Sequence, residues 1–178
     1  MINAVEYGRA LFMLTEEAGN TEAVREDVIV LSAVLKENPD FTNLLDTPAV
    51  SKSERIGVVD TVFSSVDKNL INLVKILAER REAHCMLSVL DAYLAIYDEA
   101  RGIERVEAIT ALPLTDSQKD RLKAKLEAQT GKIIIVENTV DASILGGIKL
   151  RYAGVQKDAS LRSRLDSISE SIKTIVIR

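Results

Sequence analysis

The chain has 178 residues, of which 47% are apolar, 28% charged and 4% aromatic, with no tryptophan. This length suits one large domain or two small ones, each able to bury a modest core. The low aromatic content argues against aromatic platforms that stack bases or sugars, and the net charge of −4 argues against a nucleic-acid partner.

Cysteine content and hydropathy indicate the compartment. Cys85 is the single cysteine, so an internal disulfide is impossible and a reducing compartment is expected. No apolar run approaches the roughly 18 residues that a membrane span requires. The N-terminus lacks both the pattern of a secretory signal and an Arg-rich leader. We therefore expect a soluble protein that stays where it is made.

The first hundred residues predict a bundle of short helices. Apolar residues recur at three- and four-residue spacing, and turn dipeptides such as Asn38-Pro39 interrupt the pattern. Ser51 and Glu54 have the spacing of a capping box at a helix start. The expected helices cover residues 3–18, 21–37, 40–46, 51–65, 68–80 and 82–101. Their short connections favour antiparallel packing.

Past Gly102 the pattern changes to mixed strand and helix. The expected elements are a strand over 105–112, a helix over 115–130 with a capping box at Thr115 and Gln118, strands over 132–137 and 148–152, a short return strand and a terminal helix from Ser160. The predicted fold class is α+β: a six-helix bundle over residues 1–103, then a small α/β domain with a mixed sheet over 104–178.

The segment from Asp141 to Leu165 is the most distinctive part of the sequence. Gly146-Gly147 precedes an alternating strand and allows a backbone bend or close approach that a Cβ would prevent. A tight turn follows the strand, and Ser160 begins a helix that carries Arg162 and Arg164.

This segment resembles the C-terminal signature of the delta subunit of F-type ATP synthases, the family of the oligomycin-sensitivity-conferring protein. Shorter matches to the family occur in order along the chain: Tyr7-Gly8-Arg9-Ala10-Leu11-Phe12, Glu37-Asn38-Pro39, Pro48-Ala49-Val50-Ser51, Leu77-Ala78-Glu79, Ala111-Leu112-Pro113-Leu114 and Gly131-Lys132. Two positions depart from the family pattern. Ala153-Gly154 replaces the usual Gly-Asp, and Asp158-Ala159-Ser160 replaces the commoner Asp-Gly-Ser.

The resemblance implies a stator component that is not itself an enzyme and has no cofactor or metal. Residues 1–103 would bind the alpha/beta catalytic head, and residues 104–178 would bind the b subunits of the peripheral stalk, so that rotation is coupled to ATP synthesis. The implied location is peripheral, on the cytoplasmic face of the energy-coupling membrane. That membrane would be a bacterial plasma membrane, or a thylakoid on its stromal side if the chain is plastid-encoded.

The first and fifth predicted helices carry more apolar surface than one packed face needs. Either both helices are central in the bundle, or they flank a groove for an amphipathic partner helix. The resemblance favours the groove, because the family holds the N-terminal helix of an alpha subunit there. The helical projection assigns the groove residues as Tyr7, Ala10 and Leu14 from the first helix, and Leu73, Ile76 and Arg80 from the fifth.

Other constellations favour structural roles. Adjacent helical residues point about 100° apart, so His84 and Cys85 do not form a nucleophile pair. One histidine and one cysteine cannot supply an ordinary zinc site. Arg151, Arg162 and Arg164 form a basic cluster, either for solubility and salt bridges or, as the resemblance implies, for docking the stalk.

Two alternatives remain from the residues alone. One is an unrelated helical adaptor that binds an amphipathic partner helix. The other is a small enzyme that uses the Gly-Gly and arginine region, for which the sequence supplies no nucleophile, base or metal cluster and no phosphate-binding glycine motif.

Overall fold

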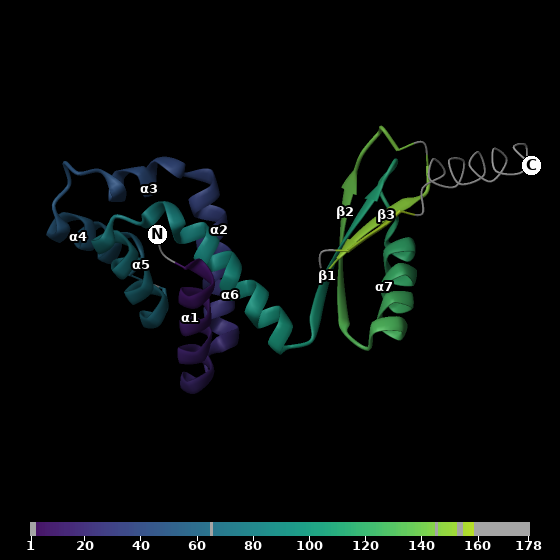
Figure 1. Cartoon of the computed structure of the whole chain (residues 1–178), viewed down its shortest axis with the longest axis horizontal. Helices are drawn as coiled ribbons and strands as arrows, with labels where there is room; N and C mark the ends of the chain where they lie inside the picture. Colours follow the sequence, from purple (N-terminus) through teal and green to yellow (C-terminus); the bar gives the residue numbers. More distant parts are fainter. Residues whose placement is uncertain (1–2, 65, 145, 153–154, 159–178) are drawn as a thin grey trace, which may run out of the picture. The chain divides into compact units, whose positions relative to one another are not determined.

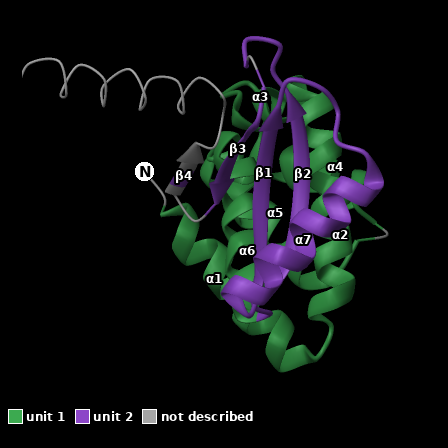
Figure 2. Cartoon of the chain, turned by 90° about the vertical axis from the view of Figure 1, so that its right-hand side faces the viewer, with its two compact units in different colours: residues 1–100 green, residues 101–178 purple. Residues whose placement is uncertain are grey.

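The computed structural model describes residues 3–64, 66–144, 146–152 and 155–158 (Figure 1). The chain divides into two compact units, unit 1 (Met1–Ala100) and unit 2 (Arg101–Arg178), which Figure 2 colours separately. The described residues are mostly helical and include a small mixed sheet. The predicted α+β class is confirmed at this level.

Unit 1 consists of helices with short connections. They are α1 (Ala4–Ala18), α2 (Thr21–Glu37), α3 (Pro39–Asp46), α4 (Lys52–Val62), α5 (Lys68–Arg80), the 3-10 helix η1 (Ala83–Cys85) and α6 (Met86–Ala100). The prediction of one helix over 82–101 is wrong, because that segment is divided into η1 and α6. The fourth helix also ends at Val62, before the predicted residue 65.

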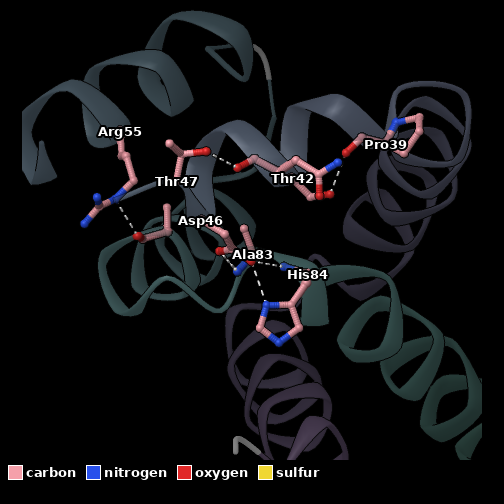
Figure 3. A network of polar contacts seen from close by, with 9 residues as sticks. Pro39, Thr42, Asp46, Thr47, Arg55, Ala83 and His84 are labelled. Carbon is pink, nitrogen blue, oxygen red and sulfur yellow. Dashed lines mark hydrogen bonds and ion pairs between the residues drawn. The ribbon is translucent and has the colours of Figure 1, made fainter. Parts of the chain in front are cut away.

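A distant carboxylate explains the division at η1. Asp46, at the end of α3, accepts hydrogen bonds from the backbone N–H groups of Ala83 at 2.7 Å and His84 at 3.0 Å (Figure 3). These bonds satisfy donors at a helix start that have no partner within the helix. They stabilise a separate 3-10 turn before α6.

The core of unit 1 receives residues from all six α-helices, among them Leu11, Val24, Leu45, Val59, Leu77 and Tyr93. Helices α1 and α6 approach closely at Gly8. A Cβ there would lie 2.8 Å from the backbone nitrogen of Tyr93 and 2.9 Å from the Ala92 Cβ. Gly8 is therefore required by packing rather than by its backbone angles.

A buried arginine joins α4 to the C-terminal end of α5. Arg55 donates from Nε to the Ala78 carbonyl at 2.9 Å, from Nη1 to the Val50 carbonyl at 2.6 Å and from Nη2 to the Glu79 carbonyl at 3.5 Å. Ala78 and Glu79 lie in the last turn of α5, where the Ala78 carbonyl also accepts the Arg81 N–H at 3.2 Å. The positive guanidinium also interacts favourably with the negative end of the helix dipole.

Unit 2 contains a four-stranded mixed sheet with one described helix. Its elements are β1 (Ile103–Thr110), α7 (Asp116–Thr130), β2 (Ile133–Val140), β3 (Ile148–Tyr152) and β4 (Val155–Asp158). The strand order is β2-β1-β3-β4, with β1 and β2 parallel and the other pairs antiparallel. A parallel pair needs a crossover, which α7 provides.

The core described for unit 2 is small and lies between α7 and one face of the sheet. It contains Val106, Leu126 and Ile134, with Leu122 and Leu150 among the partly buried residues against them. β1 alternates in burial, as expected for a strand with one covered face.

Each unit has a helix that starts with a capping box, as the sequence predicts. The capping boxes at Ser51 and Thr115 are both confirmed. The terminal helix predicted from Ser160 lies outside the described residues.

Candidate functional site: an apolar groove between α1 and α5

An open groove of about 200 Å³ runs between α1 and α5 of unit 1. Four residues of each helix line it: Tyr7, Ala10, Leu11 and Leu14 from α1, and Asn69, Asn72, Leu73 and Ile76 from α5. Both sets follow the same spacing, i, i+3, i+4 and i+7, which places them on one face of their helix. The groove is therefore formed by two matched helical faces.

The groove has a buried floor and an exposed apolar rim. Leu11 and Leu73 are buried and connect the floor to the core of unit 1. Leu14 and Ile76 are 50% and 43% exposed. Exposed large apolar residues next to a concave apolar surface are typical of a binding site for a partner.

Neutral polar groups complete the lining. Asn69 and Asn72 bring side-chain amides, and the half-buried Tyr7 brings a ring and a hydroxyl. No lining residue is charged. Such a surface suits the apolar face of an amphipathic helix, with the amides and hydroxyl able to form hydrogen bonds at its edge.

Five of the six residues predicted for this groove line it together: Tyr7, Ala10, Leu14, Leu73 and Ile76. Arg80 does not line it. It is exposed in the last turn of α5, one helical turn beyond Ile76. The prediction omitted Leu11, Asn69 and Asn72, although the spacing that selects Tyr7 and Leu73 also selects them.

The residues predicted for stalk docking are described only in part. Arg151 lies in β3, and its Nη1 is 3.0 Å from Glu107 Oε2 on the neighbouring strand β1. Arg162 and Arg164 lie outside the described residues. This partner of Arg151 lies 44 residues away in sequence.

His84 and Cys85 are held in a turn and do not form a reactive pair. His84 Nδ1 lies 2.6 Å from Asp46 Oδ2, the same carboxylate that binds the η1 backbone (Figure 3). Burial is the largest cause of a raised pKa for the Cys85 thiol, so its nucleophilic thiolate is disfavoured. Among the residues that the structure describes, no group of three His, Cys, Asp or Glu side chains lies close enough together to bind a metal ion.

Across the described parts of the chain, no helix combines the length and the apolar character needed to cross a membrane. The lining of the groove between α1 and α5 has the chemistry of a protein-binding surface. Comparison with known proteins identifies the family. Residues 4–172 match the family model described as ATP synthase delta (OSCP) subunit, and the chain belongs to this family.

Individual relatives support the assignment over nearly the full length. The ATP synthase subunit delta of Solidesulfovibrio magneticus is 34% identical, with 97% of this chain and 96% of the relative covered. The subunit delta of Azorhizobium caulinodans is 35% identical, with 97% and 94% covered. A chain in the cryo-EM structure of the Toxoplasma gondii mitochondrial ATP synthase hexamer has the same fold, with a TM-score of 0.77, 21% identity and coverage of 97% and 98%.

The resemblance found in the sequence is therefore confirmed. The chain is a non-catalytic component of the ATP synthase and belongs to its peripheral stalk. The alternative of an unrelated helical adaptor is not favoured.

Proposed function

We propose that the groove between α1 and α5 binds the N-terminal helix of an ATP synthase alpha subunit, while unit 2 binds the C-terminal end of the b subunit. The chain would then link the alpha/beta catalytic head to the peripheral stalk. The observation that carries this proposal is the pair of matched apolar faces in an open groove.

The chemistry of the groove supports a helix as its ligand. An amphipathic helix presents apolar residues at the same i, i+3, i+4 and i+7 spacing that lines both walls. Burial of an apolar side chain contributes about 1.5–3 kcal/mol relative to exposure. A few such side chains on the partner, together with Leu14 and Ile76, offset the loss of freedom on association and give tight binding.

The mechanical role requires affinity rather than turnover. A rotating shaft exerts torque on the head, and the head must be held still for that torque to drive ATP synthesis. The link must therefore dissociate slowly under repeated load, and dissociation rates are the main variable among related interfaces. An apolar contact between packed helices meets this requirement.

For unit 2, family membership and the basic residues support docking on the stalk. Arg151 is 57% exposed at its side chain although it pairs with Glu107, so it remains accessible to a partner. With Arg162 and Arg164 it would meet acidic or polar residues of the b subunit. Charge reversal at Arg162 and Arg164 is expected to weaken capture of a fragment that contains the C-terminal end of the stalk protein b. Unchanged capture would contradict this assignment.

The location follows from the same proposal. A chain that joins the head to the stalk lies on the side of the membrane that carries the head. We place it peripherally on the cytoplasmic face of a bacterial plasma membrane, or on the stromal face of a thylakoid if it is plastid-encoded.

A direct test uses isolated catalytic head and two matched variants. Ile76→Asp puts a charge into the groove, whereas Ile29→Asp puts the same charge on α2, outside the groove lining. The two parent side chains are similarly exposed, at 43% and 40%, so the folding costs should be comparable. Co-elution with the head during gel filtration is expected for the wild type and for Ile29→Asp, but not for Ile76→Asp.

Equal co-elution of both variants would refute the groove as the head-binding site. Circular dichroism of the free proteins provides the folding control, because unit 1 is helical.

A further inference from the structure

Unit 1 contains a second cavity that the proposed function does not use. It measures about 430 Å³ and lies where α2 ends, α3 begins and α4 ends. Its lining includes Val34 and Glu37 from α2, Asp40 and Phe41 from α3, and Val62 from α4. None of these residues lines the groove between α1 and α5.

The cavity has an aromatic base and an open aliphatic rim. Phe41 and Phe63 pack edge to face with ring centroids 5.5 Å apart, and Phe63 is buried. Val34 and Val62 are 42% and 53% exposed at the cavity. An edge-to-face aromatic pair is a stable base for a further apolar side chain.

The edge of the cavity is acidic. Glu37 and Asp40 line it and are exposed, and neither has an ion-pair partner among the residues that the structure describes. No lysine or arginine is among the lining residues, and Lys36 next to Glu37 does not line the cavity. Two unpaired carboxylates beside an apolar hollow attract a cationic group that accompanies an apolar one.

We propose that this cavity is a second protein-binding site, which takes a basic amphipathic helix from a partner polypeptide. An apolar side chain of that helix enters the hollow above Phe41 and Phe63, while flanking lysine or arginine residues pair with Glu37 and Asp40. The groove between α1 and α5 has a neutral edge of amides and a hydroxyl. The difference in edge charge makes the two sites selective for different helices.

The probe is a short fluorescein-labelled model helix with leucine on one face and lysine on the other. The matched control peptide has glutamate in place of lysine. Binding is measured by fluorescence anisotropy in the Ile76→Asp background, so that the groove between α1 and α5 does not contribute. This design keeps the result independent of the proposed function.

The leucine–lysine peptide is expected to bind, and the leucine–glutamate peptide is not. Val62→Lys removes part of the apolar rim and adds a repulsive charge, so it should raise the dissociation constant at least about tenfold. The double variant Glu37→Gln, Asp40→Asn should raise it by about fivefold and should reduce its dependence on salt.

Val34→Lys repeats the test of Val62→Lys from a second helix, in case one variant fails to fold. Circular dichroism decides which variants are folded. Three outcomes overturn the proposal: no binding of the leucine–lysine peptide, equal binding of the two peptides, or unchanged binding in the folded variants.

Discussion

The two units of the chain are stabilised in different ways. Unit 1 has a continuous core from six helices, including fully buried residues such as Val24, Leu45 and Tyr93. In the described part of unit 2 the core contains Val106, Leu126 and Ile134, and Leu126 is the one buried residue of α7. Unit 2 also has a capping box on α7 and cross-strand ion pairs such as Arg105 with Glu137.

This difference is related to function. A unit with a large core can leave apolar residues such as Leu14 and Ile76 on its surface and still fold. Under the proposed function those exposed residues contribute to binding. Unit 2 also exposes large apolar residues, namely Leu112, Ile133 and Val140, next to ion pairs such as Arg151 with Glu107. The comparison predicts apolar recognition by the groove of unit 1 and a mixed apolar and charged recognition surface on unit 2.

The largest expected effect comes from the buried arginine of unit 1. Arg55→Met removes the guanidinium donors to the Val50, Ala78 and Glu79 carbonyls and should lower the free energy of unfolding by about 4 kcal/mol. Urea denaturation followed by tyrosine fluorescence measures it, since three of the four tyrosines lie in unit 1.

Arg81→Met is the matched control. Arg81 is exposed, and its side chain donates a hydrogen bond of 3.4 Å to the Pro48 carbonyl, while its backbone N–H bond to the Ala78 carbonyl is unaffected by the substitution. We expect it to change the free energy of unfolding by less than about 0.5 kcal/mol. Similar losses in the two variants would show that Arg55 does not have the structural role assigned to it.

The small core of unit 2 should make it sensitive to a single truncation. Leu126→Ala removes the one buried side chain of α7 and should destabilise unit 2 by about 3 kcal/mol. Hydrogen exchange resolved by residue should show faster opening of α7 and β1, with unit 1 unchanged. Faster exchange throughout unit 1 as well would contradict the separation of the two cores.

Two glycines test how tightly unit 1 is packed. Gly8→Ala places a Cβ 2.8 Å from the Tyr93 backbone nitrogen and should cost about 2 kcal/mol. Gly57→Ala, within α4, meets nothing within 4 Å and should instead stabilise by about 0.5–1 kcal/mol through higher helix propensity. Thermal unfolding of both variants measures the difference, and shifts of the same sign would be inconsistent with this packing.

The smallest expected effect is a pH dependence of the capping box at Ser51, which the capping box at Thr115 should not show. Hydrogen bonds from the Ser51 side chain and backbone lower the pKa of Glu54 from its ordinary value. A lowered folded-state pKa contributes stability above the unfolded pKa, and this contribution is lost as pH falls through the folded pKa. The box in α7 uses Gln118, which does not titrate.

NMR titration can follow both boxes in one sample. The Ser51 amide, which donates to Glu54 Oε2, should shift with a midpoint below the ordinary glutamate range. The Thr115 amide, which donates to Gln118 Oε1, should not follow this titration. An ordinary midpoint for Ser51 would mean that the Glu54 bond is not formed in solution.

Much of the helical architecture could be predicted from local pattern. Apolar spacing identified the helices of unit 1, and Ser51 and Thr115 identified two helix starts, because these signals lie within a few residues. The turn at η1 could not be predicted in this way. It depends on Asp46, whose bonded partner His84 lies 38 residues away in sequence.

The groove between α1 and α5 was predictable because its signal, like that of the helix starts, lies within single helices. Tyr7 and Leu73 are each selected by the period of their own helix, so a projection identifies the two faces. The second cavity was not predictable, since Phe41 and Phe63 come from separate segments that meet only in the fold. The pairing of Arg151 with Glu107 likewise requires the register of β1 and β3.

Calorimetric titration with a peptide that copies the N-terminal helix of an alpha subunit tests the central claim most directly. The account predicts saturable binding to the wild type and to Ile29→Asp, binding at least about tenfold weaker to Tyr7→Ala, and none measurable to Ile76→Asp. Equal dissociation constants for these four folded proteins would contradict the assignment of the groove between α1 and α5 as the binding site.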